Sequence, residues 1–311
     1  MDRRDFGLAL ALGLGTTQKS WGRGEADPWE AIEARVGGRL GVALLDTADG
    51  RLQGHRLDER FPMCSTFKWL AASAVLQRVD AGEERLDRRI VYGREVLLPH
   101  SPVSEKHVGG DGLSVGELCE AAVTVSDNAA ANLLLDSFGG PAGVTRHARA
   151  LGDTVTRLDR TEPALNEGTP GDPRDTTTPR AMAQALRSAA LGTRLSPASR
   201  AQLLRWMEAA STGFDRLRAG FPKDWRVADK TGTGERGTSN HVALAWPPGR
   251  APLVVAAYLT GSGASGRQRN AALAEVGRAV AAGGAAGMAG PAAAAASSAS
   301  MPSGATGRLY R

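Results

Sequence analysis

The order of strand-like and helix-like segments along the chain restricts its fold more than any other feature. Apolar runs between turn residues predict strands near both ends of the chain, at 39–46, about 51–57, 225–231, 240–246 and 253–259. The short turns within each group favour antiparallel pairing. Between the two groups, from 61 to about 210, apolar residues recur at helical spacing instead. The two ends of the chain are therefore expected to form one sheet, with a helical lobe inserted between them.

The predicted fold class is α/β, an α+β sandwich. A helix at 28–36, capped by Asp27, and a final helix at about 267–282 are expected to cover an antiparallel sheet of about five strands. The inserted lobe is all helical. Its helices are expected at 65–76, 114–123, 128–138, 141–151, 178–186 and 197–208. Because clefts between lobes commonly hold binding sites, a functional site is expected where the sheet meets this lobe.

Composition divides the 311 residues into three parts. Residues 1–26 pair Arg3-Arg4 with a short apolar run, which resembles a twin-arginine export signal and predicts a periplasmic or secreted protein. Residues 27–283 form the folded domain, with the sheet lobe from 27–60 and 215–283 and the helical lobe from 61–214. Residues 284–311 are rich in Gly, Ala and Ser, which predicts a disordered tail.

Several classes of function are disfavoured by what the chain lacks. The net charge of +5 is scattered, without a basic run interleaved with aromatic residues, so a nucleic-acid partner is not expected. No segment is long and apolar enough for stable membrane association. The five histidines have no metal-ligand spacing, so neither a metal nor another cofactor is expected. Cys64 and Cys119 are expected to be free, buried thiols.

Ser65 and Lys68 begin the first helix of the predicted lobe. Residues three apart share a helix face, so the Ser65 hydroxyl and the Lys68 amine can touch. Pro62 places Ser65 in or near the first turn, where unsatisfied N–H groups favour developing negative charge. This arrangement suits a nucleophile with an adjacent base. A single Ser-x-x-Lys pair is close to chance expectation, however, so the assignment depends on the rest of the chain.

Three further motifs lie in different structural contexts. They are Ser126-Asp127-Asn128 between two helices, Glu162 to Asn166 in the long loop 159–179, and Lys230-Thr231-Gly232 at the end of a strand. Each alone has an ordinary explanation as a helix cap, a solvated loop carboxylate or a strand end. Together, and in this order, all four motifs resemble the signature of the class A β-lactamases. The resemblance extends over about 40–282, and two of only five lysines fall on motif positions.

The resemblance implies catalytic roles. Ser65 would attack the β-lactam carbonyl and become acylated, with the backbone N–H groups of Ser65 and Thr233 as the oxyanion hole. Either Lys68, or Glu162 through a water, would accept the Ser65 proton, and the sequence leaves both open. Ser126 would pass a proton to the departing nitrogen. Glu162 would activate the water that hydrolyses the acyl-enzyme.

The resemblance also implies substrate-binding positions. Many relatives place an Arg where this chain has Ser239, and Arg216 matches the alternative used by other members. Asp127 is expected to be structural. The expected binding residues are Lys230, Thr231, Gly232, Thr233 and Arg216 for the substrate carboxylate, Asn128 for the acylamino carbonyl, Asn166 for the hydrolytic water, and His100 at the cleft mouth, where relatives have an aromatic residue.

Loop 159–179 resembles the omega loop of this family. The resemblance implies that Arg160 and Asp175 pair to hold the loop, and that the Glu162–Pro163 peptide is cis. A loop that carries a catalytic carboxylate must be rigid to about half an ångström.

Three functions remain as hypotheses. The first is a monomeric, exported serine β-lactamase that hydrolyses small-molecule penicillins and cephalosporins and gives antibiotic resistance. The second is a penicillin-binding D,D-peptidase, which shares three motifs but does not need Glu162 and Asn166 for deacylation. The third is a non-catalytic β-lactam sensor, which would require a membrane anchor and a long-lived acyl-enzyme.

Overall fold

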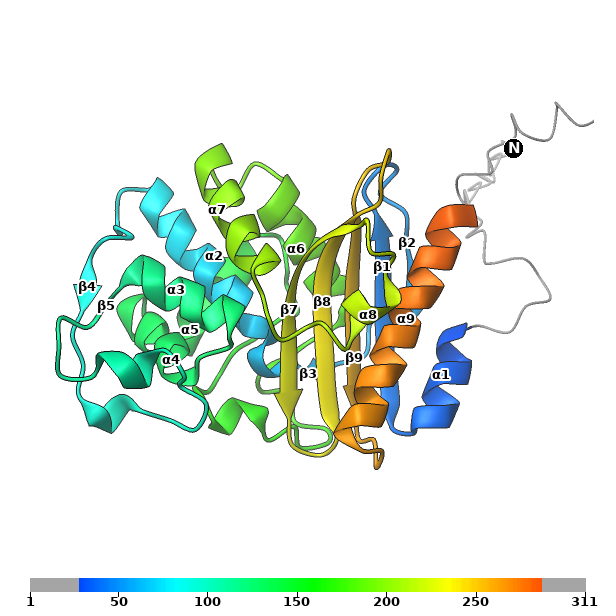
Figure 1. Cartoon of the computed structure of the whole chain (residues 1–311), viewed down its shortest axis with the longest axis horizontal. Helices are drawn as coiled ribbons and strands as arrows, with labels where there is room; N and C mark the ends of the chain where they lie inside the picture. The colour runs from blue at the N-terminus through cyan, green and yellow to red at the C-terminus, as the bar shows by residue number, and fades with distance from the viewer. Residues whose placement is uncertain (1–27, 287–311) are drawn as a thin grey trace, which may run out of the picture.

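The computed structural model describes residues 28–286. Figure 1 shows the sheet with the helical lobe on one side and the helices from the two ends of the chain on the other. The predicted export signal and the tail beyond residue 286 lie outside the described residues.

One sheet is built from both ends of the chain, as the sequence predicts. Its order is β2-β1-β9-β8-β7, and all neighbouring strands are antiparallel. The pairing of β1 with β9, from Arg39 opposite Thr260 to Asp46 opposite Leu253, joins the two chain ends. The strands are β1 (Arg39–Asp46), β2 (Leu52–His55), β7 (Arg226–Gly234), β8 (Thr238–Trp246) and β9 (Leu253–Thr260).

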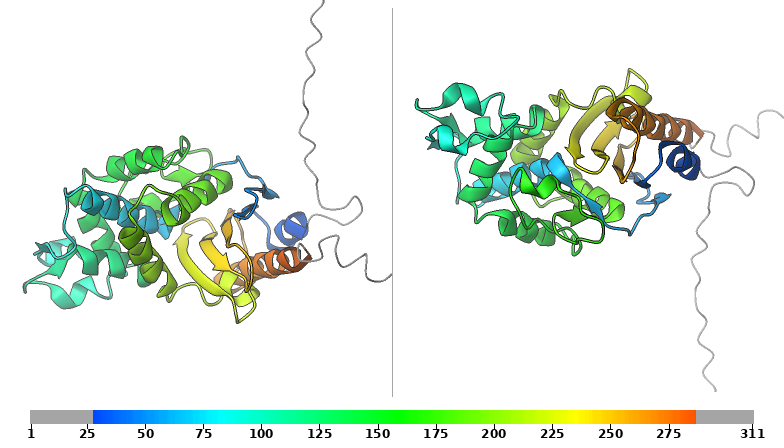
Figure 2. Two further views of the ribbon diagram at one scale, coloured as in Figure 1. Left: turned by 90° about the horizontal axis from the view of Figure 1, so that it is seen from above. Right: turned by 90° about the horizontal axis from the view of Figure 1, so that it is seen from below.

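The sheet is buried on both faces. Successive side chains of a strand point to opposite faces, and in β9 Val255 and Leu259 pack with the terminal helices while Val254 and Tyr258 face the helical lobe. The terminal helices are α1 (Pro28–Val36) and α9 (Gly266–Ala286), which pack against each other. The short helix α8 (Leu217–Gly220) packs against α9. Both views of Figure 2 show α1 and α9 on the side of the sheet opposite the helical lobe. This double burial explains why β9 is a continuous apolar run.

Helix α2 (Phe67–Asp80) forms the centre of the helical lobe. Residues 67–76 are all buried, which is typical of a helix that is surrounded by other elements. Lys68 is among these residues, with its side chain fully enclosed. The surrounding helices are α3 (Val115–Thr124), α4 (Asn128–Ser137), α5 (Pro141–Ala150), α6 (Pro179–Leu191) and α7 (Pro197–Glu208).

Some boundaries differ from the prediction. Strand β7 continues to Gly234, so Lys230-Thr231-Gly232 lies within the strand and not at its end. Helix α9 continues to Ala286, because alanine favours the helix beyond the predicted end. Ser65 lies in a 3₁₀ turn, η1 (Cys64–Thr66), that leads into α2. The short elements β3 (Phe61–Pro62) with β6 (Thr176–Thr177), β4 (Arg89–Ile90) with β5 (Leu113–Ser114), η2 (Arg94–Val96), η3 (Ser104–His107) and η4 (Ala164–Asn166) were not predicted, because such pieces are too short to show a period.

A buried histidine is expected to make the helical lobe less stable in acid. His147 Nδ1 lies 2.9 Å from Gln77 Oε1, and its Nε2 lies 2.8 Å from Ser73 Oγ. Burial lowers the pKa of His147 to about 4, well below the usual histidine value of about 6.5. The unfolded chain therefore binds a proton at a higher pH than the folded protein does, so stability is lost as the pH falls from 6.5 towards 4.

His147→Gln is expected to remove this loss. Between pH 6.5 and 4, the unfolding free energy of the wild type should fall by up to about 3 kcal/mol more than that of His147→Gln. Urea unfolding across this pH range measures the difference. Parallel pH curves for the two proteins would show that His147 is not responsible.

Candidate active site

The sheet holds the turn that carries Ser65. The buried Asn240 of β8 donates from Nδ2 to the Met63 carbonyl oxygen at 3.1 Å. A Cβ on Gly232 would lie 2.8 Å from the same oxygen, so β7 approaches this turn too closely for any larger residue. Cys64 has a φ of 46°, a sparsely populated conformation that is often found at functional sites. Ser65 therefore lies between the helical lobe and the sheet. Asn240 was missed in the sequence, although a buried amide in an apolar strand is a usable signal.

Lys68 connects three motifs. Its amine lies 3.0 Å from Glu162 Oε1, 2.9 Å from the Ser126 carbonyl oxygen and 2.6 Å from Asn128 Oδ1. Burial lowers the pKa of Lys68, and the Glu162 carboxylate opposes that shift. Ser65 makes no direct hydrogen bond to Lys68 in the described part of the chain. Its hydroxyl instead donates to Glu162 Oε1 at 3.1 Å, so the carboxylate lies between the two groups that were expected to touch.

Ser126 lies between two buried lysines. Its Oγ accepts from Lys230 Nζ at 3.0 Å and lies 3.4 Å from Lys68 Nζ. Burial lowers the pKa of Lys230 well below its usual value, and the nearby Lys68 charge lowers it further. Ser126 has a φ of 63°, which turns the chain sharply between α3 and α4. The hydroxyl is therefore presented to both amines.

Asp127 is structural, as expected. Its carboxylate accepts hydrogen bonds from the backbone N–H groups of Val103, Ser104 and Ala130, and from the Ser104 hydroxyl, all between 2.8 and 2.9 Å. It caps α4 and ties that helix to the segment leading into η3, which fixes the Ser126 turn.

The polar side chains of β7, at the edge of the sheet, point alternately to its two faces. Lys230 points to the helical lobe, where it meets Ser126. Thr231 and Thr233 point to the other face, where Thr231 Oγ1 lies 2.6 Å from Thr212 Oγ1 and Thr233 Oγ1 accepts from Arg216 at 2.7 Å. Thr212 was not predicted. The resulting cleft has a volume of about 320 Å³ and is lined by Ser65, His100, Ser126, Asn128, Asn166, Thr212, Arg216, Thr231, Gly232 and Thr233.

Arg216 is buried and not solvated. Its Nη1 donates to the carbonyl oxygens of Gly232 at 2.8 Å and Asn240 at 2.9 Å, and its Nε donates to Asn270 Oδ1 at 2.9 Å. With the bond to Thr233, four of the five guanidinium hydrogens are occupied. Burial lowers the pKa of Arg216 from its usual value. The sequence did not identify Asn270, because its role depends on α9 passing beside α8.

A buried histidine supports the Arg216 segment. His241 Nδ1 accepts a hydrogen bond from the Leu217 backbone N–H at 3.1 Å. The ring proton must therefore be on Nε2, which donates to Asp229 Oδ2 at 2.7 Å. His241 and Asp229 were not predicted as contributors to the site, and strand alternation alone does not distinguish them from core polar residues.

Loop 159–179 brings Glu162 and Asn166 into the site. The Asn132 side chain forms two hydrogen bonds with the Glu162 backbone. Asn132 Nδ2 donates to the Glu162 carbonyl oxygen at 2.9 Å, and the Glu162 N–H donates to Asn132 Oδ1 at 3.0 Å. Asn166 donates to Glu162 Oε2. The Glu162–Pro163 peptide is cis, as the resemblance implied. Asn132 was missed, although it lies four residues after Asn128 and therefore on the same face of α4.

The predicted pair, Arg160 and Asp175, holds the base of the loop. Arg160 Nε lies 2.6 Å from Asp175 Oδ2, and Arg160 Nη1 lies 2.6 Å from Glu167 Oε2. Asp175 Oδ1 also accepts from the backbone N–H groups of Asp159 and Arg160, at 2.7 and 2.9 Å. The fully buried Asp175 carboxylate therefore closes the base of the loop.

His100 lies on the cleft wall. Its Nε2 is 2.9 Å from the Val125 carbonyl oxygen, and its own carbonyl oxygen accepts from the Asn128 N–H at 3.0 Å.

Cys64 and Cys119 are both buried and free. Within residues 28–286, no helix is long and apolar enough to cross a membrane, and no cluster of three or more His, Cys, Asp or Glu side chains could hold a metal ion.

Comparison with known proteins gives one consistent family. Residues 27–283 match the model of the beta-lactamase enzyme family. A structure described as the last common ancestor of Gram-negative bacteria class A beta-lactamase is 64% identical with a TM-score of 0.81, over 82% of this chain and 97% of that one. The chain belongs to the class A β-lactamases. A putative class A β-lactamase, PenP from Rhodopseudomonas palustris, is 62% identical with a TM-score of 0.81, over 82% of this chain and 97% of that one. This β-lactamase is therefore a hydrolase of cyclic amides.

Asp175→Asn is expected to loosen the loop of this β-lactamase. The change leaves Arg160 or a backbone N–H without its buried acceptor, which should lower the unfolding free energy by about 2–4 kcal/mol. Denaturant unfolding measures this change, and hydrogen exchange should accelerate within 159–175. The control is Asp58→Asn, which breaks an exposed pair with Arg180 and should change little. Equal effects of the two variants would contradict the anchoring role of Asp175.

Proposed function

We propose that this enzyme hydrolyses the β-lactam ring of penicillins and cephalosporins through a Ser65 acyl-enzyme, which is deacylated by a water that Glu162 activates. We further propose that it is exported by the signal at 1–26, acts in the periplasm as a monomer and gives antibiotic resistance. The observation that carries the mechanism is the position of one Glu162 oxygen, within 3.1 Å of Ser65 Oγ and 3.0 Å of Lys68 Nζ.

The proton contacts favour Glu162 as the acceptor of the Ser65 proton. Four acceptor atoms surround Lys68 Nζ, namely Glu162 Oε1, the Ser126 carbonyl oxygen, Ser126 Oγ and Asn128 Oδ1. They suit the ammonium form, which has three hydrogens to donate and no lone pair to accept the Ser65 proton. Ser65 donates directly to Glu162, so the proton can move to the carboxylate as Ser65 Oγ bonds to the lactam carbonyl carbon.

Ser126 is placed to complete acylation. As the lactam C–N bond breaks, the nitrogen requires a proton, and the Ser126 hydroxyl would supply it. The Lys230 and Lys68 amines at Ser126 Oγ stabilise the negative charge that then develops on this oxygen. Lys68, which contacts both Ser126 and Glu162, would then give a proton to Ser126 and take the one held by Glu162, so that Glu162 is a carboxylate again for deacylation. The N–H groups of Ser65 and Thr233 would hold the carbonyl oxygen in the tetrahedral intermediate. Removal of one such donor typically costs about 3–4 kcal/mol of transition-state stabilisation.

Substrate binding would use both faces of β7. The Thr231 and Thr233 hydroxyls and Arg216 form the pocket for the substrate carboxylate, and Lys230 adds positive charge. Because Thr233 Oγ1 accepts from Arg216, its own hydrogen is free to donate to that carboxylate. Asn128 would hold the acylamino carbonyl, and His100 would contact the substrate at the cleft mouth.

Ser65→Ala and Glu162→Gln separate the two chemical steps. With a chromogenic cephalosporin, the wild type should turn over repeatedly, and Ser65→Ala should be slower by at least about 10³-fold. Glu162→Gln should acylate more slowly than the wild type, because Glu162 also accepts the Ser65 proton, but it should then stop after at most one equivalent of product, and mass spectrometry should show a stable acyl adduct on Ser65. Glu120→Gln, at an exposed position on α3, is the matched control and should behave as wild type.

Other outcomes would overturn the proposal. Normal turnover by Glu162→Gln would remove Glu162 from deacylation. A single stoichiometric burst from the wild type would instead support a penicillin-binding D,D-peptidase or a sensor.

Arg216→Gln tests the carboxylate site. Loss of a charge-assisted hydrogen bond of about 1.5–3 kcal/mol should raise KM by roughly 10- to 100-fold, with a smaller change in kcat. A cephalosporin with a methylated carboxylate should show almost none of this loss. An equal loss with the ester would indicate that the variant disturbs β7 and not recognition of the carboxylate.

A further inference from the structure

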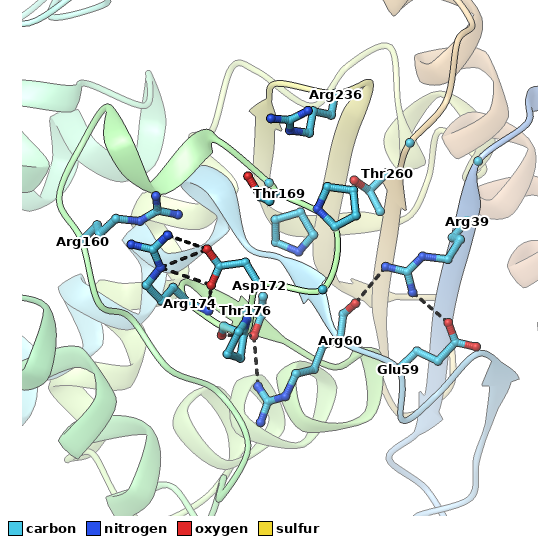
Figure 3. Close-up of a pocket in the computed structure, with 17 residues that line it drawn as sticks. Arg39, Glu59, Arg60, Arg160, Thr169, Asp172, Arg174, Thr176, Arg236 and Thr260 are labelled. Atoms are coloured by element: carbon cyan, nitrogen blue, oxygen red, sulfur yellow. Dashed lines mark hydrogen bonds and ion pairs between the residues drawn. The ribbon is translucent and has the colours of Figure 1, made fainter.

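Arg216 carries its positive charge to the catalytic cleft without a carboxylate partner. Within the described part of the chain it makes no ion pair, and its four hydrogen bonds go to neutral acceptors. In the larger pocket that Figure 3 shows, by contrast, Arg174 is paired with Asp172 at 2.6 Å. A guanidinium that is held only by neutral groups keeps its charge for a ligand carboxylate. Its direction depends on those neutral acceptors and on the backbone that carries it.

The two residues that follow Arg216 are both held by a buried histidine–aspartate pair of the sheet. His241 Nδ1 accepts from the Leu217 N–H at 3.1 Å, and the Asp229 carboxylate pairs with the Arg218 guanidinium. The two members of the pair contact each other, with His241 Nε2 donating to Asp229 Oδ2 at 2.7 Å, and neither side chain is exposed. Leu217 is the first residue of α8, so the pair fixes the backbone immediately after Arg216.

The segment before Arg216 packs on the same pair. A Cβ on Gly213 would lie 2.2 Å from Asp229 Oδ2 and 2.8 Å from His241 Cε1, so the segment approaches the pair too closely for a larger residue. The Arg216 N–H in turn donates to the Gly213 carbonyl oxygen at 3.2 Å. Thr212, which lines the cleft, directly precedes this glycine. The pair therefore supports both residues that this segment contributes to the cleft.

Strand alternation places the pair beside the hydroxyl groups of the cleft. Asp229, Thr231 and Thr233 alternate along β7 and therefore point to the same face of the sheet. His241 of β8 lies directly opposite Thr231 in the strand register. The pair and the hydroxyls that face the proposed substrate carboxylate are thus neighbours on one face.

His241 is held in the tautomer that this support requires. Its Nδ1 accepts from Leu217, so its own hydrogen lies on Nε2, where the Asp229 carboxylate accepts it. Burial lowers the pKa of His241, although the Asp229 charge opposes this shift. A neutral ring keeps the Nδ1 lone pair for the Leu217 N–H, whereas a protonated ring would turn a second N–H towards it.

We propose that His241 is a positioning residue for recognition of the substrate carboxylate. By accepting the Leu217 N–H, it fixes the backbone from which Arg216 reaches into the cleft. Asp229 acts one step further away, because it holds the tautomer of His241. The inference rests on the proposed role of Arg216 in carboxylate binding. Loss of the Nδ1 acceptor should weaken binding of substrates that carry this carboxylate, with little effect on the chemical steps.

Two substitutions separate the roles of the two ring nitrogens. In His241→Asn, Oδ1 is bonded to Cγ as Nδ1 is, so it can still accept from the Leu217 N–H. In His241→Gln, Nε2 can still donate to Asp229, but the Leu217 N–H loses its buried acceptor. Both variants should be less stable than the wild type in thermal unfolding, whereas only His241→Gln should impair carboxylate recognition.

Steady-state kinetics with a chromogenic cephalosporin and with its methyl ester measure the effect. His241→Gln should raise KM for the free carboxylate roughly tenfold, with kcat changed by less than about threefold, because an unmet buried N–H displaces the Arg216 segment and not the reacting groups. The ester should show almost none of this loss, and His241→Asn should keep KM close to that of the wild type. His147→Gln, the same substitution at a buried histidine of the helical lobe, is the matched control and should leave both KM values unchanged.

Three results would overturn the proposal. The first is a wild-type KM for the free carboxylate in His241→Gln. The second is an equal rise in KM for the acid and the ester, which would indicate a general disturbance of the cleft. The third is the same carboxylate-specific loss in His241→Asn and His241→Gln, which would show that recognition does not depend on the Nδ1 acceptor.

Arg216→Gln distinguishes a failure of this proposal from a failure of the proposed function. If Arg216→Gln loses carboxylate recognition while His241→Gln keeps it, only the role of His241 is wrong. If Arg216→Gln also keeps it, the proposed carboxylate site is wrong, and the positioning role falls with it.

Discussion

The buried ammonium of Lys68 is the constraint on which the site depends. Enclosing an unpaired charge costs several kcal/mol, so each hydrogen of this group needs an acceptor. The acceptors come from the Ser126 turn, the first residue of α4 and loop 159–179. The amine of Lys68, on a helix that is otherwise packed on every side, therefore brings these separate segments together next to Ser65. Lys230 makes a similar demand from the sheet, because its buried amine reaches the Ser126 hydroxyl.

Hydrogen bonds of two asparagines and one aspartate hold these segments in place. Asn132 holds the Glu162 backbone on the cleft side of the loop, and Asp175 gathers Arg160 and two backbone N–H groups at the base. Asn240 fastens the Ser65 turn to β8. All three side chains are largely removed from water, where hydrogen bonds orient groups strongly and an unsatisfied partner is costly. The carboxylate that contacts both Ser65 and Lys68 is therefore positioned by the loop anchors as much as by its own side chain.

Much of the fold and of the candidate site could be predicted from local patterns. Strand alternation, helix caps and apolar spacing predicted the five-stranded sheet and the helices of the inserted lobe. The motif resemblance identified Ser65, Lys68, Ser126, Glu162 and Lys230, and the structure brings these residues together. The direct contact of Ser65 with Lys68 was expected from their helical spacing, but Glu162 lies between the two groups. Asn132, His241 and Asn270 were missed, because each gains its role from a partner that is distant in sequence.

The sequence by itself determined the class of fold, the family and the identity of the reacting groups, because periodicity and motif order are local properties of the chain. Only the tertiary structure decided which hydrogen bonds those groups make. Arg216 is an example: its sequence context suits a solvated surface arginine equally well, yet it is buried where α8 packs against α9, and its guanidinium bonds to Gly232 and Thr233 of β7.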